Sequence, residues 1–178
     1  MSATNTNQVD KLKLLVVQRS QKQSAEIFKL GEILGRVELG KVVTQRAANF
    51  SAEYYQTEKA VDFCGESVES YSNPSWAPKR ESWVPEQRLA GLGFRLTEDG
   101  AGEEMVVTFG LPQHIDAIYG PVLCLVLHND GLTFRQGRVA HKPMAGDWFI
   151  FNDRANHGVK EANGEAVFCG LVLPLERL

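Results

Sequence analysis

The sequence predicts a mainly β protein, a small double-sheet jelly roll or barrel with one or two N-terminal helices packed outside it. From Leu89 onward, short apolar runs alternate with tight-turn signals such as Asn129-Asp130-Gly131. Short strands joined by such turns are typical of sandwiches and small barrels. Before Leu89, apolar residues recur at helical spacing instead, which predicts helices there.

Length and composition predict one domain with its own core. The chain has 178 residues, of which 43% are hydrophobic, and this length suffices for a single domain. Residues 1–10 are polar and predict a disordered tail. We therefore expect one domain over 11–178, with helices and loops in 11–90 supporting a β core in 91–178.

The N-terminal half predicts one strand and two helices. Residues 11–17 form a strand candidate. Ser24 is a plausible N-cap for a helix that ends near Val37, where glycines accumulate. A second helix is expected from Ala52 to about Phe63, with Asn49 or Ser51 as its cap.

Residues 69–87 differ from the rest of the chain because they contain three prolines and two tryptophans. This composition predicts a loop rather than a regular element. One interpretation is a surface loop whose tryptophans, Trp76 and Trp83, pack over the core. The other is a lid over an active site, since long loops in compact domains are often functional.

The C-terminal half predicts a succession of short strands. A further short strand is expected to begin at His157. The other candidates are Leu92–Thr97, Glu104–Phe109, Gln113–Asp116, Val122–His128, Leu132–Arg135, Arg138–His141, Trp148–Asn152 and Val167–Leu173.

Two histidines and an aspartate have the order of a metal site. His114 and Asp116 are separated by one residue, and His157 follows 41 residues after Asp116. In a strand, residues i and i+2 point to the same face, so His114 and Asp116 can reach one metal ion. Two imidazoles and one carboxylate on one side of an octahedron suit non-haem Fe(II) and leave positions open for oxygen and a co-substrate. Asn152, Asp153 and Asn156 are near enough in sequence to fix the imidazoles.

A second His-x-Asp pair, His128 and Asp130, competes for the same role. Asn129-Asp130-Gly131 lies between two apolar runs and is a strong hairpin signal. Asp130 is therefore better explained as a turn residue. Only 26 residues separate Asp130 from His157, whereas 40 separate Asp116 from His157. The longer spacing leaves more room for the strands that must lie between the ligands. A three- or four-histidine site that also uses His128 or His141 stays open.

Charge and cysteine usage argue against several protein classes. The net charge is −3 and the pI about 5.8, which gives no general attraction to nucleic acid or anionic membranes. No apolar run approaches the length of a membrane span. The three cysteines are far apart and form no CxxC pair. These features predict a cytoplasmic protein.

The segment from Leu111 to Leu175 resembles the catalytic half of Fe(II)/2-oxoglutarate-dependent oxygenases, which have a double-stranded β-helix (cupin-like) fold. The resemblance is carried by Gln-His114-Ile-Asp116, by Gly146-Asp147 before an apolar strand, and by His157-Gly-Val before a closing apolar strand. It implies His114, Asp116 and His157 as metal ligands, with Fe(II) as cofactor and 2-oxoglutarate and molecular oxygen as co-substrates.

The sequence departs from this family at the residue that binds the far carboxylate of 2-oxoglutarate. Family members usually place Arg or Lys about ten residues after the last histidine, where this chain has Val167. Arg135, Arg138 or Lys160 could substitute, and we favour Arg135 because its expected strand lies between the metal-site segments. The hydroxyl of Tyr119 could add a hydrogen bond to the same carboxylate.

The resemblance implies an oxygenase that hydroxylates or demethylates its substrate. A small molecule or an amino-acid side chain is the expected substrate, because no basic and aromatic stripe indicates nucleic acid. One alternative is a cupin-like metalloenzyme that does not use 2-oxoglutarate, which would explain Val167. Another is a metal-free jelly-roll binding protein. The sequence does not indicate the oligomeric state.

Overall fold

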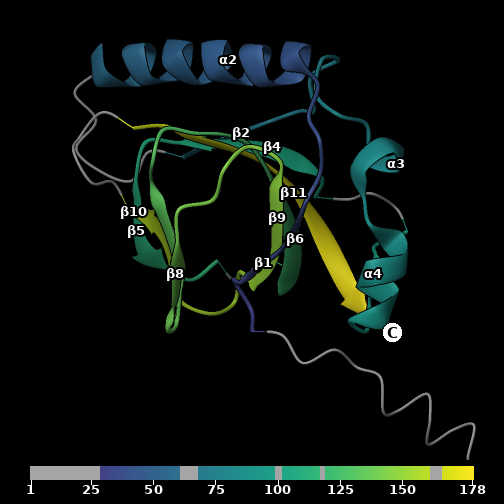
Figure 1. The fold of residues 1–178 in the computed structure, drawn as a ribbon. Helices are drawn as coiled ribbons and strands as arrows, with labels where there is room; N and C mark the ends of the chain where they lie inside the picture. The colour runs from purple at the N-terminus through teal and green to yellow at the C-terminus, as the bar shows by residue number, and fades with distance from the viewer. Residues whose placement is uncertain (1–28, 61–67, 99–101, 117–118, 161–165) are drawn as a thin grey trace, which may run out of the picture.

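The computed structural model describes residues 29–60, 68–98, 102–116, 119–160 and 166–178. Within these residues the chain folds into two antiparallel sheets and three helices (Figure 1). The expected tail at 1–10, the strand at 11–17 and the start of the first expected helix lie outside the described residues.

The larger sheet, here called the major sheet, has the strand order β1-β9-β6-β11-β4-β2, and one further strand, β3, pairs with β11. All of these pairings are antiparallel. The strands are β1 (Ile33–Arg36), β2 (Val68–Tyr71), β3 (Phe94–Leu96), β4 (Glu104–Thr108), β6 (Pro121–Asn129), β9 (Asp147–Asn152) and β11 (Phe168–Arg177).

The smaller sheet, here called the minor sheet, has the strand order β5-β10-β7-β8 and is also antiparallel. Its strands are β5 (Leu111–His114), β7 (Thr133–Gln136), β8 (Val139–His141) and β10 (His157–Lys160). The chain passes between the two sheets several times, so that consecutive strands in the sequence are often in different sheets. The two curled antiparallel sheets form a cupin-like jelly roll.

The two faces of the major sheet pack against different partners, because successive side chains in a strand point to opposite faces. On β6, Leu123 and Leu125 belong to the core beneath the helices. Val122 and Cys124 belong to a second core, which faces the minor sheet and includes Phe134 of β7. The molecule therefore has three layers: helices, major sheet and minor sheet.

Three helices cover the outer face of the major sheet. The longest, α2 (Lys41–Ala60), lies along this sheet in Figure 1 and places Val43, Ala47, Phe50 and Tyr54 against the core at helical spacing. The two short helices, α3 (Arg80–Trp83) and α4 (Glu86–Gly91), contribute Trp83 and Leu89 to the same core. None of the helices in the described part of the chain combines the length and the apolar character needed to cross a bilayer.

The expected fold class is confirmed, and each C-terminal strand candidate corresponds to an observed strand within a few residues. Two of these boundaries matter for the site. β10 begins at His157, as expected. β5 ends at His114, so Asp116 does not share a strand with His114, as the sequence predicted, but reaches the site from the segment after the strand.

The prediction of a helix that ends near Val37 is wrong for the residues that the structure describes. Ile33–Arg36 is instead strand β1, at the edge of the major sheet, where Gly35 and Arg36 pair with Trp148 and Asp147. A Cβ atom at Gly35 would lie 2.7 Å from Nε1 of Trp148, so the close approach of these strands requires glycine. The side chains of Arg36 and Asp147 also form an ion pair of 2.6 Å.

The second expected helix is confirmed in type but not in extent. It begins at Lys41 rather than at Ala52, and the amides of Val43 and Thr44 donate to the carbonyl oxygen of Gly40. The expected caps, Asn49 and Ser51, lie inside the helix instead. Ser51 is fully buried against the sheet.

The loop expected at 69–87 is only partly a loop. It contains most of β2, all of α3 and the start of α4. Trp83 is buried and Trp76 is partly buried, both in the core beneath the helices. The site described below is lined by the second core, which lies on the opposite face of the major sheet. The tryptophans therefore pack in the core beneath the helices and form no lid over this site.

Candidate metal centre

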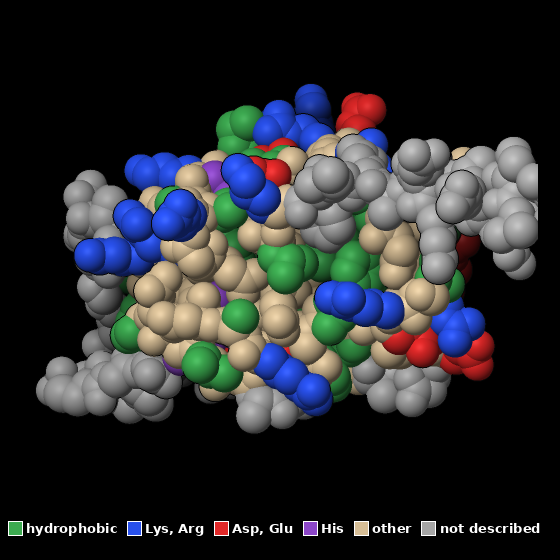
Figure 2. All heavy atoms as spheres, turned by 90° about the horizontal axis from the view of Figure 1, so that it is seen from below, with side chains coloured by type: hydrophobic (Ala, Val, Ile, Leu, Met, Phe, Trp, Pro, Cys, Tyr) green, Lys and Arg blue, Asp and Glu red, His purple; other side chains and the backbone are tan. Residues whose placement is uncertain are grey.

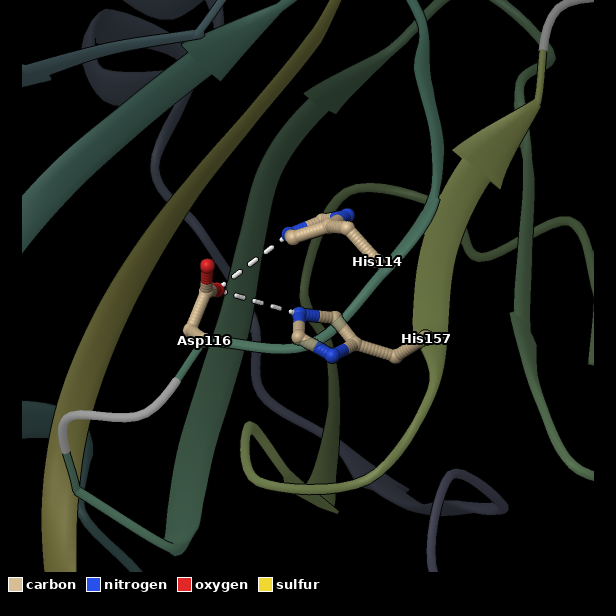
Figure 3. Close-up of side chains that lie close together, drawn as sticks. All are labelled: His114, Asp116 and His157. Atoms are coloured by element: carbon tan, nitrogen blue, oxygen red, sulfur yellow. Dashed lines mark hydrogen bonds and ion pairs between the residues drawn. The ribbon is translucent and has the colours of Figure 1, made fainter.

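The pairing of two strands places His114 beside His157. β5 and β10 are antiparallel, and the Cα atoms of these two histidines are register partners. Their rings are tilted, with centroids 4.5 Å apart. Asp116 follows β5 and points back toward both imidazoles, as Figure 3 shows.

The three side chains have the spacing of ligands around one metal ion. Oδ2 of Asp116 lies 3.2 Å from Nε2 of His114 and 3.4 Å from Nε2 of His157. Two ligands at a right angle, each about 2.1 Å from a metal, are about 3 Å apart. Within the described residues, these three form a group whose ligand atoms all lie within 4.8 Å of one another. The group could therefore hold a metal ion.

Backbone carbonyl groups orient both imidazoles. Nδ1 of His114 lies 2.8 Å from the carbonyl oxygen of Pro112, and Nδ1 of His157 lies 3.0 Å from that of Ala155. A carbonyl oxygen can only accept, so each Nδ1 carries the proton and each Nε2 keeps its lone pair for a metal. The side chains of Asn152 and Asn156 do not have the orienting role expected for them.

The electrostatic environment favours neutral His157. Its side chain is 8% exposed, compared with 45% for that of Asp116. Burial lowers the pKa of His157, and the hydrogen bond to Ala155 opposes this effect. A neutral imidazole is the form that binds a metal.

Asp153 holds the segment that carries Asp116. The amide of Asp116 donates to the carbonyl oxygen of Asp153 over 2.9 Å. The carboxylate of Asp153 is buried and accepts hydrogen bonds from the amides of Tyr119 and Gly120, the first over 2.8 Å. A buried carboxylate that accepts amide hydrogen bonds is strongly held. Asp153, which lies in the turn between β9 and β10, therefore binds Asp116 as well as Tyr119 and Gly120.

The three donors lie in the wall of a cavity between the two sheets, with a volume of about 450 Å³. Most of the wall is apolar and comes from the second core, including four phenylalanines. Among the described lining residues there is no Lys or Arg. The polar or charged side chains that line it are Glu104, Thr108, His114, Asp116, Tyr119, Asp153 and His157.

The competing pair, His128 and Asp130, lies apart from this group. The amide oxygen of Asn129 accepts from the backbone of Gly131 and Leu132, at 3.1 and 2.9 Å. Asp130 pairs with His128 at 2.8 Å. Asp130 therefore lies in a turn, as expected. The expected hairpin is wrong, however, because the strands on either side of this turn, β6 and β7, lie in the major and the minor sheet.

His141 also lies apart from the metal group. Its Nε2 is hydrogen bonded to the carbonyl oxygen of Gly31, and its ring packs against Phe134 and Phe149. Neither His128 nor His141 belongs to the metal-binding group found in the described residues. This arrangement leaves the three- or four-histidine site without a geometric basis.

The basic residues expected to bind 2-oxoglutarate lie outside the cavity. Phe134 and Gln136 of β7 point inward and are buried, so Arg135 between them points outward and is exposed. Arg135 and Lys160 both line a neighbouring depression, which shares Leu111, Gly158 and Val159 with the cavity, but neither lines the cavity itself. Arg138 is exposed in the β7–β8 turn. Figure 2 shows several Lys and Arg side chains gathered at the side of the molecule where the minor sheet lies.

Of the four residues considered for the co-substrate, only Tyr119 lines the cavity within the described chain. The position usually occupied by the basic residue is taken by Val167, which is buried in the core beneath the helices. The alternation in β7 was the signal that could have excluded Arg135. A similar alternation in β4 could have identified Glu104 and Thr108 as cavity residues. Met105 and Val107 point to the core beneath the helices, so Glu104 and Thr108 point to the opposite face, where the cavity lies.

Comparisons with known proteins find similarity at the level of structure. No family model matches the sequence, and no curated protein matches it. An RmlC-like cupin protein from Desulfovibrio desulfuricans is 20% identical, with a TM-score of 0.32, over 46% of this chain and 80% of that one. AviO1 from Streptomyces viridochromogenes Tue57 is 12% identical, with a TM-score of 0.48, over 82% of this chain and 88% of that one. The description of the fold rests on the strand order and register given above.

Proposed function

We propose that this protein is a mononuclear non-haem Fe(II) oxygenase whose substrate binds in the cavity between the two sheets. The observation that carries the proposal is the convergence of His114, Asp116 and His157 in the wall of a mainly apolar cavity. Two imidazoles and one carboxylate that leave coordination positions open are the ligand set of non-haem Fe(II) oxygenases.

The donors fit a divalent iron in number, type and protonation. Nε2 of His114 and Nε2 of His157 are free of protons in the assigned tautomers, because both Nδ1 atoms donate to carbonyl oxygens. One carboxylate leaves part of the charge of a divalent ion uncompensated. Asp116 is the most exposed of the three ligands, so an ion can reach the site from its side.

The chain contributes orientation and shielding to the chemistry. Bound iron would supply oxygen binding and one-electron oxidation. Asp153 and the carbonyl groups of Pro112 and Ala155 would keep the three ligands in place. The apolar walls would exclude water and hold a small molecule or an amino-acid side chain next to the metal.

The described cavity does not fit 2-oxoglutarate well. The far carboxylate of this co-substrate needs a cationic partner, and none of the described lining residues is Lys or Arg. Glu104 would repel it. These observations favour a cupin-like oxygenase that does not use 2-oxoglutarate.

Dependence on 2-oxoglutarate is the second candidate, and Tyr119 favours it. Its side chain lines the cavity with the metal ligands, and its hydroxyl could donate to a carboxylate. In this version of the function, Tyr119 rather than Arg135 would bind the co-substrate.

An anaerobic Fe(II) titration with and without 2-oxoglutarate tests both versions. Iron binding without a new visible charge-transfer band on adding 2-oxoglutarate supports the first version. A band that requires both components would establish the second. Absence of iron binding would contradict both and leave a metal-free binding protein.

A further inference from the structure

The floor of the cavity is charged at one end and aromatic at the other. Glu104 of β4 is the register partner of Val172 on β11, Val172 pairs with Cys124 on β6, and Cys124 pairs with Phe149 on β9. All four side chains line the cavity. Three strand intervals of roughly 4.8 Å each span about 14 Å. This row therefore crosses the whole floor.

The aromatic end of this row lies beside the metal ligands. Phe151 is two residues beyond Phe149 on the same strand, so it points to the same face. Its ring centroid lies 4.8 Å from that of His157. A molecule lying along the row could place one end at Glu104 and extend its apolar body toward the phenylalanines near His157.

The carboxylate of Glu104 has no oppositely charged partner among the described residues. Its exposure is intermediate, and within the described residues no Lys, Arg or His forms an ion pair with it. A partly desolvated carboxylate is stabilised by a positively charged partner. The faces of Phe134, Phe149, Phe151 and Phe168, which also line the cavity, attract cations as well as apolar groups.

We propose that the cavity selects an organic amine, a molecule with an apolar body and a positively charged ammonium group that pairs with Glu104. This inference deepens the proposed function, because it takes the cavity as the substrate site and names the class of substrate. A carboxylate of the same shape would meet Glu104 as a like charge, and a neutral analogue would gain only the apolar contacts.

Calorimetric titration of the metal-free protein with three probes tests the inference. Phenethylamine, phenethyl alcohol and hydrocinnamate share the phenethyl group and carry a positive, a neutral and a negative end. The amine is expected to bind at least about tenfold more tightly than the alcohol, which is about 1.4 kcal/mol. Hydrocinnamate is expected to bind more weakly than both.

Two variants assign the preference to one carboxylate. Glu104→Gln should reduce the preference for the amine about tenfold while leaving the affinity for the alcohol unchanged, which also reports that the cavity is intact. Glu103→Gln is the matched control, since Glu103 does not line the cavity and should leave the preference intact. Equal binding of hydrocinnamate, a preference that survives Glu104→Gln, or no binding of the amine would overturn the inference. Since no metal is present, these outcomes are independent of the Fe(II) titration.

Discussion

His114 and His157 are register partners in the antiparallel pair β5 and β10, although 42 residues separate them in the sequence. This pairing places both side chains on the inner face of the minor sheet. Each ring then donates through Nδ1 to a carbonyl oxygen two residues earlier in its own segment. The same local arrangement therefore occurs twice and turns both Nε2 atoms toward Asp116.

Asp153→Asn should weaken metal binding without removing a ligand. The substitution replaces one carboxylate oxygen by an amide group that cannot accept from the backbone of Tyr119 or Gly120. Loss of a hydrogen bond to a charged group costs about 1.5–3 kcal/mol of unfolding free energy. Displacement of Asp116 should lower the affinity for Fe(II) about 10- to 100-fold, measured by calorimetry.

Asp130→Asn is the control for this variant, because Asp130 is a turn residue outside the metal group. It should leave the affinity for Fe(II) unchanged. If Asp153→Asn loses stability but keeps its full affinity, the carboxylate of Asp153 has no role in positioning Asp116.

The strands of the β core could be predicted because their side chains alternate or form short apolar runs between turns. β1 could not, since Ile33, Leu34 and Val37 also match helical spacing. Its strand conformation depends on β9, which lies more than 100 residues away in the chain. Non-local pairing of this kind overrides local propensity, and no pattern within β1 reveals it.

Gly35→Ala tests the close contact that makes β1 a strand. The new methyl group would lie 2.7 Å from Nε1 of Trp148, so the indole or β1 must shift. Overpacking of this kind typically costs about 1–3 kcal/mol, which urea denaturation would detect as a lower midpoint.

Gly91→Ala provides the comparison for Gly35→Ala, because a Cβ atom at Gly91 meets nothing within 4 Å and Gly91 is the last residue of α4, where alanine suits the helical backbone. It should change stability by less than Gly35→Ala does. Equal effects at the two glycines would mean that space beside Trp148 is not what constrains β1.

His141 should make stability depend on pH. Burial lowers its pKa in the folded state, against an opposing effect of the hydrogen bond to Gly31. Its Nδ1 is buried and has no hydrogen-bond partner among the described residues, so a proton on this atom would have no acceptor there. In the unfolded chain His141 has an ordinary pKa of about 6.5.

Below this pH the unfolded state binds more protons at His141 than the folded state does, so stability falls with decreasing pH. The stabilisation is present above pH ~6.5 and is lost as the pH falls toward the lowered pKa of the folded state. Urea denaturation over this range should show a shallower pH dependence for His141→Gln than for the unchanged protein. Identical slopes would show that His141 does not contribute.

The three residues of the candidate metal centre could be predicted as a group because their types, order and spacing are all visible in the sequence. The residues around them were harder to predict, since some act through backbone groups and the others depend on the side of the strand on which they lie, which only the alternation within each strand indicates. Arg135 illustrates the second point: it lies in the expected strand, but the buried neighbours Phe134 and Gln136 place it on the outer face. The carbonyl oxygens of Pro112 and Ala155 illustrate the first, because any residue could supply them.

The most direct test of the metal centre is the number of Fe(II) ions bound per chain under anaerobic conditions. The unchanged protein and His128→Ala should each bind one ion, since His128 lies outside the metal group. His157→Ala should bind none while keeping its far-ultraviolet circular dichroism spectrum. Full iron binding by a folded His157→Ala variant would contradict the proposed centre.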